Sequence, residues 1–258
     1  DVRDCMARIA AAATRGMDTR DSGDEPSVWD KEMTKRQEQV MLLLSVVELG
    51  NVALFKRNLP LYVKDGLINE KDVHYGLTAL ISASMHGHVG MVQLLLERNA
   101  TVDLLDSIGR TALMGSACGG HLMITNMLLD RGANPNLQDN QGATALIHSA
   151  HQGYKDVSKL LLEHHAKINL PDSNGRSALM AAAHQNHIDV IKLLLKNGAA
   201  VDKEALSGGT ALMITAFKGY TKAARALLQY NASTNIIDEE GNAALMLASK
   251  TGRVDVVQ

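Results

Sequence analysis

The chain has 258 residues, of which 46% are apolar but only 3% aromatic, and its formal net charge is −2. This balance gives no reason to expect a nucleic-acid partner, and the sequence contains no apolar run of about 18 residues that would predict a membrane span. The two cysteines, Cys5 and Cys118, are too few for a disulfide framework and favour a reducing compartment, that is, an intracellular and cytoplasmic location.

Residues 1–36 contain no internal repeat and are predicted to form a flexible N-terminal leader. The stretch from Met6 to Thr14 is rich in alanine, which favours a helix on propensity alone. Residues 18–26 are charged, small and rich in helix breakers, as is typical of a linker. An alternative interpretation makes this segment a docking peptide centred on Trp29, the only tryptophan in the chain.

Residues 37–72 are predicted to form one irregular capping unit. An apolar run from Gln39 to Glu48 precedes Gly50-Asn51 and a second apolar stretch from Val52 to Leu59, which predicts two helices joined by a tight turn. The step from this unit to the next is 37 residues, four more than the step of 33 in the rest of the chain. Pro60 and Gly66 are helix breakers, so the excess is predicted to lie in an enlarged loop.

Residues 73–258 are organised by one phrase, Gly-x-(Thr/Ser/Ala)-Ala-Leu, which recurs every 33 residues. The copies start at Gly76, Gly109, Gly142, Gly175, Gly208 and Gly241. A leucine column and an alanine column keep the same step: Leu95, Leu128, Leu161, Leu194 and Leu227; Ala100, Ala133, Ala166, Ala199 and Ala232. A fixed period of about 20 to 50 residues indicates a stacked repeat array. We therefore predict five complete repeats and a truncated sixth.

Each repeat predicts two helices and a loop. The threonine of the phrase can cap the first helix through its hydroxyl, and a later glycine ends that helix in a tight turn. A second helix carries a leucine pair and closes at a residue that tolerates a left-handed backbone, before a hairpin-like loop leads to the next phrase. The capping threonines are Thr78, Thr111, Thr144 and Thr210, and Ser177 and Ala243 depart from this pattern; the closing residues are Asn99, Gly132, His165, Gly198 and Asn231.

These elements resemble those of the ankyrin-repeat family, which implies an all-α solenoid. The resemblance rests on the run from Gly109 to Leu113, on Gly120-His121 and on the run from Leu128 to Asn136, with counterparts in every repeat. It covers residues 73–258 closely and 39–72 loosely. The family's Thr-Pro-Leu-His is here Thr-Ala-Leu followed by methionine or isoleucine. We interpret this column as core rather than as a soft binding surface; its members are Met114, Ile147, Met180, Met213 and Met246.

Ten histidines raise the hypothesis of a metal site. His148 and His151 share a helix face, as do His184 and His187, and His151 and His184 hold the same position in adjacent repeats. Structural zinc takes four ligands, however, and no carboxylate or cysteine stands at ligand spacing among them. Cys118 has neither an orienting acid nor an oxyanion site. No metal, cofactor or catalytic residue is therefore predicted.

The resemblance implies a non-catalytic module that binds a protein or peptide through a concave face of loop tips and first helices. Contact positions are then the two residues before and the one after each opening glycine, together with the pair before the turn between the helices. Phe217 is the leading anchor, because interface energy concentrates in aromatic and arginine side chains. The predicted partner-binding residues are Tyr75, Met85, Arg110, His151, Arg176, His184, Phe217, Lys218 and Lys250.

Two alternatives stay open at this point. The segment is the regulatory or tethering domain of a larger protein, such as a channel, kinase or ligase subunit, or it is a structural subunit of a large assembly. The last residues, Val254 to Gln258, are in register with Val89 to Gln93, so the sequence stops within a second helix, just before its leucine run. We therefore expect the protein to continue beyond Gln258.

Overall fold

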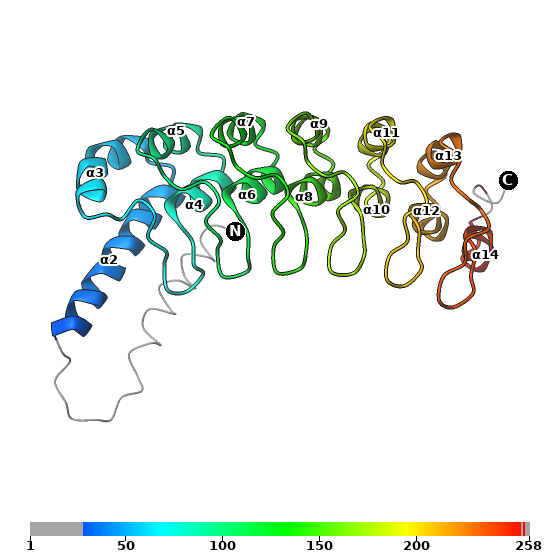
Figure 1. Ribbon diagram of the computed structural model, residues 1–258, viewed down its shortest axis with the longest axis horizontal. Coiled ribbons are helices and arrows are strands. Elements are labelled where there is room, and N and C mark those ends of the chain that lie inside the picture. Colours follow the sequence, from blue (N-terminus) through cyan, green and yellow to red (C-terminus); the bar gives the residue numbers. More distant parts are fainter. Residues whose placement is uncertain (1–27, 254, 256–258) are drawn as a thin grey trace, which may run out of the picture. The chain divides into compact units, whose positions relative to one another are not determined.

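Helices make up the array, as the repeat predicts. The computed structural model describes residues 28–253 and residue 255. Within that range the all-α prediction is confirmed, and the single β-bridge joins Ile237 and Ala243. The helices, shown in Figure 1, are α2 (Val28–Glu48), α3 (Val52–Lys64), α4 (Ala79–Met85), α5 (Val89–Glu97), α6 (Ala112–Gly119), α7 (Leu122–Asp130), α8 (Ala145–Gln152), α9 (Lys155–Glu163), α10 (Ala178–His184), α11 (Ile188–Lys196), α12 (Ala211–Lys218), α13 (Thr221–Gln229) and α14 (Ala244–Lys250).

The predicted N-terminal leader is described only in part. The alanine-rich stretch and the linker lie outside the described residues. Helix α2 begins at Val28, so the last nine residues of the predicted leader are helical. The flexibility of the leader stays a prediction. Trp29 falls in the first turn of α2, and its role as a docking residue stays a prediction.

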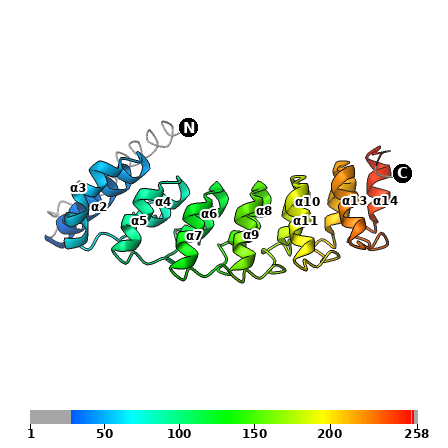
Figure 2. The same ribbon diagram turned by 90° about the horizontal axis from the view of Figure 1, so that it is seen from above.

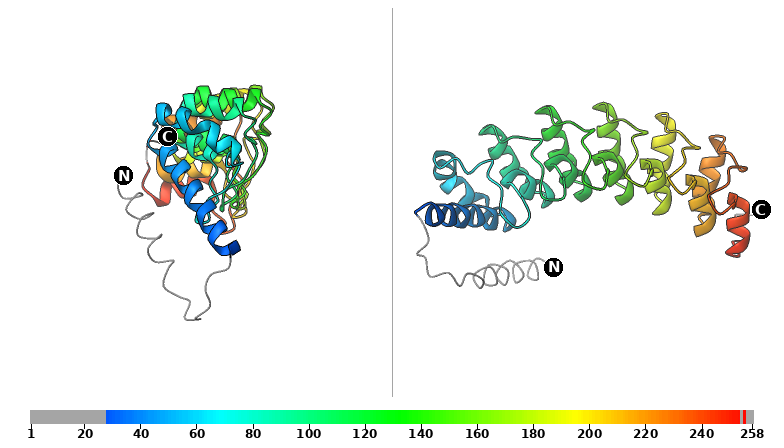
Figure 3. Two further views of the ribbon diagram at one scale, coloured as in Figure 1. Left: turned by 90° about the vertical axis from the view of Figure 1, so that its left-hand side faces the viewer. Right: turned by 60° about the horizontal axis from the view of Figure 1, so that its bottom comes forward.

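The helices of the repeats form two rows. We call α4, α6, α8, α10, α12 and α14 the inner helices, and α3, α5, α7, α9, α11 and α13 the outer helices. Each inner helix packs against the next inner helix, and the outer helices pack in the same order (Figures 1 and 2). From α4 to α13 each inner helix also packs against the outer helix that follows it. The right-hand view of Figure 3 shows these pairs succeeding one another, from cyan to red.

Side-chain caps start the inner helices where the sequence predicts them. The hydroxyl oxygen of Thr111 accepts a hydrogen bond from the backbone N–H of Met114 at 3.2 Å, and Ser177 caps α10 in the same way. Such a bond satisfies an N–H group that has no partner within the helix. Ala243 makes no such bond to α14, so the predicted exception is confirmed as well.

The outer helices end at residues with a left-handed backbone conformation. Asn99, His165 and Asn231 have φ values of 58°, 64° and 61°, and glycines fill the other two positions of this column. Asparagine and histidine adopt this conformation more readily than other non-glycine residues, because their side chains can form local hydrogen bonds. The predicted helix ends are therefore confirmed.

The irregular unit differs from its prediction at Pro60. This proline lies inside α3 rather than in a loop, and α3 has 13 residues where the next outer helix, α5, has 9. The four extra residues are thus one additional helical turn. Phe55, Leu59 and Tyr62 are buried along one face of α3, with the spacing of a helix. Their burial outweighs the backbone hydrogen bond that a proline removes.

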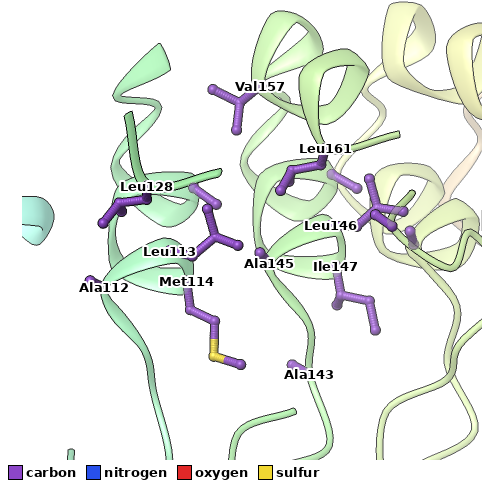
Figure 4. Close-up of a cluster of buried hydrophobic side chains, with 14 of the residues drawn as sticks. Ala112, Leu113, Met114, Leu128, Ala143, Ala145, Leu146, Ile147, Val157 and Leu161 are labelled. Atoms are coloured by element: carbon purple, nitrogen blue, oxygen red, sulfur yellow. The ribbon is translucent and has the colours of Figure 1, made fainter. Parts of the chain in front are cut away.

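The core is built in layers between successive repeats. Leu113 and Met114 project from α6 towards the next repeat, where Ala145 and Leu146 of α8 lie (Figure 4). Met114 is 2% exposed, and the same column is buried in the next three repeats. The interpretation of this column as core is confirmed for them. Met246 is 57% exposed, because the described residues place no further inner helix over α14.

Candidate functional site

The loops before the inner helices form a continuous edge. Each loop donates one backbone hydrogen bond to the loop of the preceding repeat, for example from Asn140 N–H to the Ile108 carbonyl at 3.0 Å. The same bond joins each of the five pairs of successive loops from Gly76 to Gly241, at 2.8 to 3.2 Å, and fixes the spacing of the loop tips. We call the surface formed by these tips and the exposed sides of the inner helices the inner face.

An aspartate stabilises most of these loops from within. The Asp172 carboxylate accepts hydrogen bonds from the backbone N–H groups of Asn174 and Arg176 at 2.8 and 2.9 Å, and a third from Arg176 Nε at 2.9 Å. The pattern repeats at three further aspartates, each three residues before the opening glycine: Asp106, Asp139 and Asp238. Sequence analysis missed this column, although its spacing of 33 residues is visible in the sequence.

The loop before α12 has no aspartate that accepts these bonds. Ala205 stands where the column requires Asp, and Gly209 stands where other repeats carry Arg110 and Arg176. The loop keeps its shape because Ala205 N–H still bonds the Gly209 carbonyl at 2.9 Å. The loop therefore keeps its backbone conformation although alanine and glycine replace the aspartate and arginine of other repeats.

A groove opens on the inner face at this loop. Its volume is about 460 Å³, and it spans α10, α12, α14 and the two loops between them. The lining residues are His184, Ser207, Gly209, Met213, Ile214, Phe217, Lys218, Asp238, Glu239, Glu240 and Leu247. Apolar side chains form its floor, and charged side chains stand at its rim. A concave apolar site with a few polar groups is the usual form of a binding site.

The nine predicted contact residues all lie on the inner helices or their loops, but only some of them converge. Six stand in the last turns of inner helices: Met85, His151, His184, Phe217, Lys218 and Lys250. Three stand at loop tips: Tyr75, Arg110 and Arg176. His184, Phe217 and Lys218 line the groove together. The other six do not line it, and their part in binding stays a prediction.

Exposure differs within the predicted set. The Phe217 and Tyr75 side chains are each 51% exposed, which is unusual for large aromatic residues. Arg176 and Arg110 each pair with the loop aspartate four residues earlier, with an Nε to carboxylate distance of 2.9 Å. These pairs hold the guanidinium groups in place at the loop tips. Met85 and Lys218 are half-buried.

Three histidines make hydrogen bonds or ion pairs within the scaffold. His121 and His187 bond to the turns of the preceding repeats, where their Nε2 atoms lie 3.1 and 3.0 Å from the carbonyls of Met85 and His151. His148 instead pairs with Asp139 at 2.9 Å. Within residues 28–253 and 255, no three His, Cys, Asp or Glu side chains are grouped so as to hold a metal ion.

Two histidines of the inner face favour the neutral form. Burial lowers the pKa of His184 below its ordinary value, and the nearby Lys218 ammonium lowers it further. Burial likewise lowers the pKa of His151, with a smaller effect from His187. Since a neutral imidazole is favoured at both positions, the fixed positive charge around the groove comes from lysine and arginine.

The stacked units of helix, turn, helix and loop define a helical solenoid. The family model described as ankyrin repeats (3 copies) matches residues 42–139, 124–205 and 197–258. The chain therefore belongs to the ankyrin-repeat family, whose members are generally protein-interaction modules and typically non-catalytic. None of the curated proteins compared with the chain matches it. No helix in the described part of the chain is both long and apolar enough to cross a membrane.

Proposed function

We propose that this chain is a non-catalytic module that binds a protein or peptide partner through its inner face. The observation that carries the proposal is the groove around Phe217, where a half-exposed aromatic ring stands in a hollow on a scaffold of stacked helices. Aromatic anchors of this kind supply much of the energy of protein interfaces. The partner-binding set is the nine residues predicted from the sequence.

The division of labour within each repeat supports this proposal. The leucine and alanine columns recur from repeat to repeat and are largely buried, as Leu128, Leu161 and Leu194 illustrate. The inner-face positions differ from repeat to repeat, and they include aromatic, cationic, amide and acidic side chains. A varied surface on a regular scaffold suits a partner with its own irregular side chains, such as a protein. It does not suit the regular charge of a nucleic acid.

The exposed thiol of Cys118 supports a proposal about the compartment. Cys118 is exposed and forms no disulfide within the described residues. An exposed thiol of this kind favours a reducing, intracellular location. A chain purified without reductant should therefore form intermolecular disulfides that Cys118→Ser lowers or prevents.

Affinity capture with a pair of variants tests the binding proposal. The wild-type chain, Phe217→Ala and Met123→Ala are immobilised separately, and the proteins that each retains are quantified by mass spectrometry. Met123 is 67% exposed on outer helix α7, so it offers a matched apolar control on another surface. We expect at least one protein to be retained by the wild type and Met123→Ala but lost by Phe217→Ala. Equal retention by all three would contradict binding through the inner face.

A further inference from the structure

The groove owes its depth to a missing side chain. At the position of Gly209, the other repeats carry Leu77, Arg110, Ala143, Arg176 and Asn242, each larger than glycine. A Cβ atom placed on Gly209 would meet only the Ser207 hydroxyl, at 3.5 Å. The space beside Phe217 is therefore empty because this residue lacks a side chain, and the backbone does not require glycine there.

The walls of the groove are apolar below and acidic above. Met213, Ile214 and Leu247 are the aliphatic residues that line the groove together with Phe217. Three carboxylates stand at the rim, from residues 238–240, against the single ammonium group of Lys218 among the lining residues. His184, the remaining titratable lining residue, favours its neutral form. The lining residues together thus carry a net negative charge, which favours a cation over an acidic ligand. Two further cations lie near the groove, Lys250 beside Asp238 and Arg176 beside His184.

One of the three carboxylates is available to a ligand. Asp238 is used by its own loop, because it accepts hydrogen bonds from the backbone N–H groups of Glu240 and Asn242 at 3.0 and 2.8 Å. Glu240 lies 3.2 Å from the side-chain amide of Asn242. Glu239 is exposed, and within the described residues no group donates a hydrogen bond to its carboxylate. This carboxylate can pair with an incoming cation without breaking an existing bond.

We propose that the groove binds an arginine side chain presented by the partner protein or peptide. The methylene groups of the arginine lie along the aliphatic floor, its guanidinium stacks on the Phe217 ring, and it donates hydrogen bonds to Glu239. The planar guanidinium suits both contacts, since it stacks on aromatic faces and binds carboxylates with two parallel hydrogen bonds. A lysine ammonium matches the charge but not the planar geometry. This inference rests on the proposed function and adds the side chain that the surface selects.

Selection of peptides tests the inference without knowledge of the partner. The immobilised chain is exposed to a phage-displayed library of random short peptides, and the bound sequences are compared with those bound by Glu239→Gln. We expect arginine at one fixed position of the peptides that the wild type selects, and loss of this preference with Glu239→Gln. Glu163→Gln on outer helix α9 removes the same charge from an exposed residue elsewhere and should select the wild-type peptides.

Affinities of a selected peptide then test the individual contacts. Loss of the charged pair in Glu239→Gln should weaken binding about tenfold, the same factor as a loss of 1.4 kcal/mol. Replacing the peptide arginine by lysine should weaken binding about fivefold, since the stacked, bidentate geometry is lost. Gly209→Arg places the side chain of the equivalent positions into the groove and should abolish binding. Its thermal midpoint should not fall, because the added Cβ has room.

The outcomes separate this inference from the proposed function. Selected peptides without a preferred arginine, or an arginine preference that Glu239→Gln leaves unchanged, would overturn the arginine site while leaving an inner-face interaction module in place. Failure to select any peptide, combined with equal capture of proteins by the wild type and Phe217→Ala, would overturn both proposals. If Gly209→Arg binds more weakly and also has a lower thermal midpoint, its loss of binding reflects unfolding. The affinity of Glu239→Gln then decides, because its exposed side chain does not support the fold.

Discussion

The loops before α10 and α12 have the same pattern of backbone hydrogen bonds but carry different side chains. In both, the first residue donates to the carbonyl four residues later at 2.9 Å, and the opening glycine donates back to the first residue at 2.9 Å. In the first loop, Asp172 adds three hydrogen bonds and Arg176 covers the tip. In the second, Ala205 and Gly209 add neither.

This difference shows how a regular solenoid acquires a local site. The backbone hydrogen bonds are sufficient to shape the loop, so the side chains at these two positions are free to change. Gly209 leaves open space in the groove, which Phe217 and the acidic residues of the next loop also line. The groove thus arises where small residues replace larger ones in a regular repeat, and not from an inserted loop or helix.

The outer helices of the two repeats should respond alike to a core substitution. Leu194 in α11 and Leu227 in α13 are fully buried at equivalent positions. Replacing either by alanine should lower the free energy of unfolding by about 3 kcal/mol, because a cavity remains in the core. Urea unfolding followed by circular dichroism measures both variants. If one variant loses much free energy of unfolding and the other almost none, only the repeat with the large loss is firmly packed.

Removing Asp172 should leave the loop before α10 with backbone hydrogen bonds alone, as in the loop before α12. Asp172→Ala eliminates a nearly buried carboxylate that accepts two backbone bonds and one from Arg176. We expect the free energy of unfolding to fall by about 2 kcal/mol, since hydrogen bonds to charged groups are among the stronger ones. Glu204→Ala, an exposed acidic control, should have little effect in the same urea titration. Similar losses for the two variants would point to general charge rather than to the loop bonds.

The reverse substitution should stabilise the second loop. Asp at position 205 would face the backbone N–H groups of Ser207 and Gly209, which correspond to the groups that Asp172 binds. Ala205→Asp should therefore raise the free energy of unfolding by about 1 kcal/mol. Ala205→Asn serves as an uncharged comparison and should raise it less. A destabilised Ala205→Asp would mean that the acidic loop at residues 238–240 repels the new charge more than the N–H groups attract it.

The smallest effect on stability is expected at the groove itself. Phe217 is half exposed and lies at the end of α12, so Phe217→Ala should change the free energy of unfolding by no more than about 0.5 kcal/mol. Thermal unfolding measured by calorimetry checks this expectation. A loss as large as that of Leu194→Ala would assign Phe217 to the core and remove it from the binding surface.

The sequence predicts those parts of the fold that depend on local chemistry. Thr111 and Ser177 cap helices, and His165 closes one, because their own side chains and backbones decide these features. At Pro60 the residue type predicts a loop, but the helical spacing of the buried residues around it decides the structure. The helix assignment there depends on packing, which only the folded chain shows.

The groove was harder to predict because it depends on residues from three repeats. Phe217 and Lys218 were identified from their position in the repeat, and both line it. The roles of Gly209 and Glu239 depend on an empty space and on an unpaired carboxylate, and neither property belongs to a residue type. The aspartate column could have been found from its spacing, and the gap at Ala205 would then have marked the unusual loop.

The backbone bonds between successive loops have a mechanical consequence. Each repeat is tied to the one before it by a bond at the loop tip, such as Ser173 N–H to the Gln141 carbonyl at 2.8 Å. A second bond lies at the base of the loop, such as Ala200 N–H to Asn169 Oδ1 at 2.8 Å. These links are in series, so tension along the array would be borne by one repeat boundary after another. A pulled array should therefore extend by stepwise release of repeats rather than by one abrupt rupture.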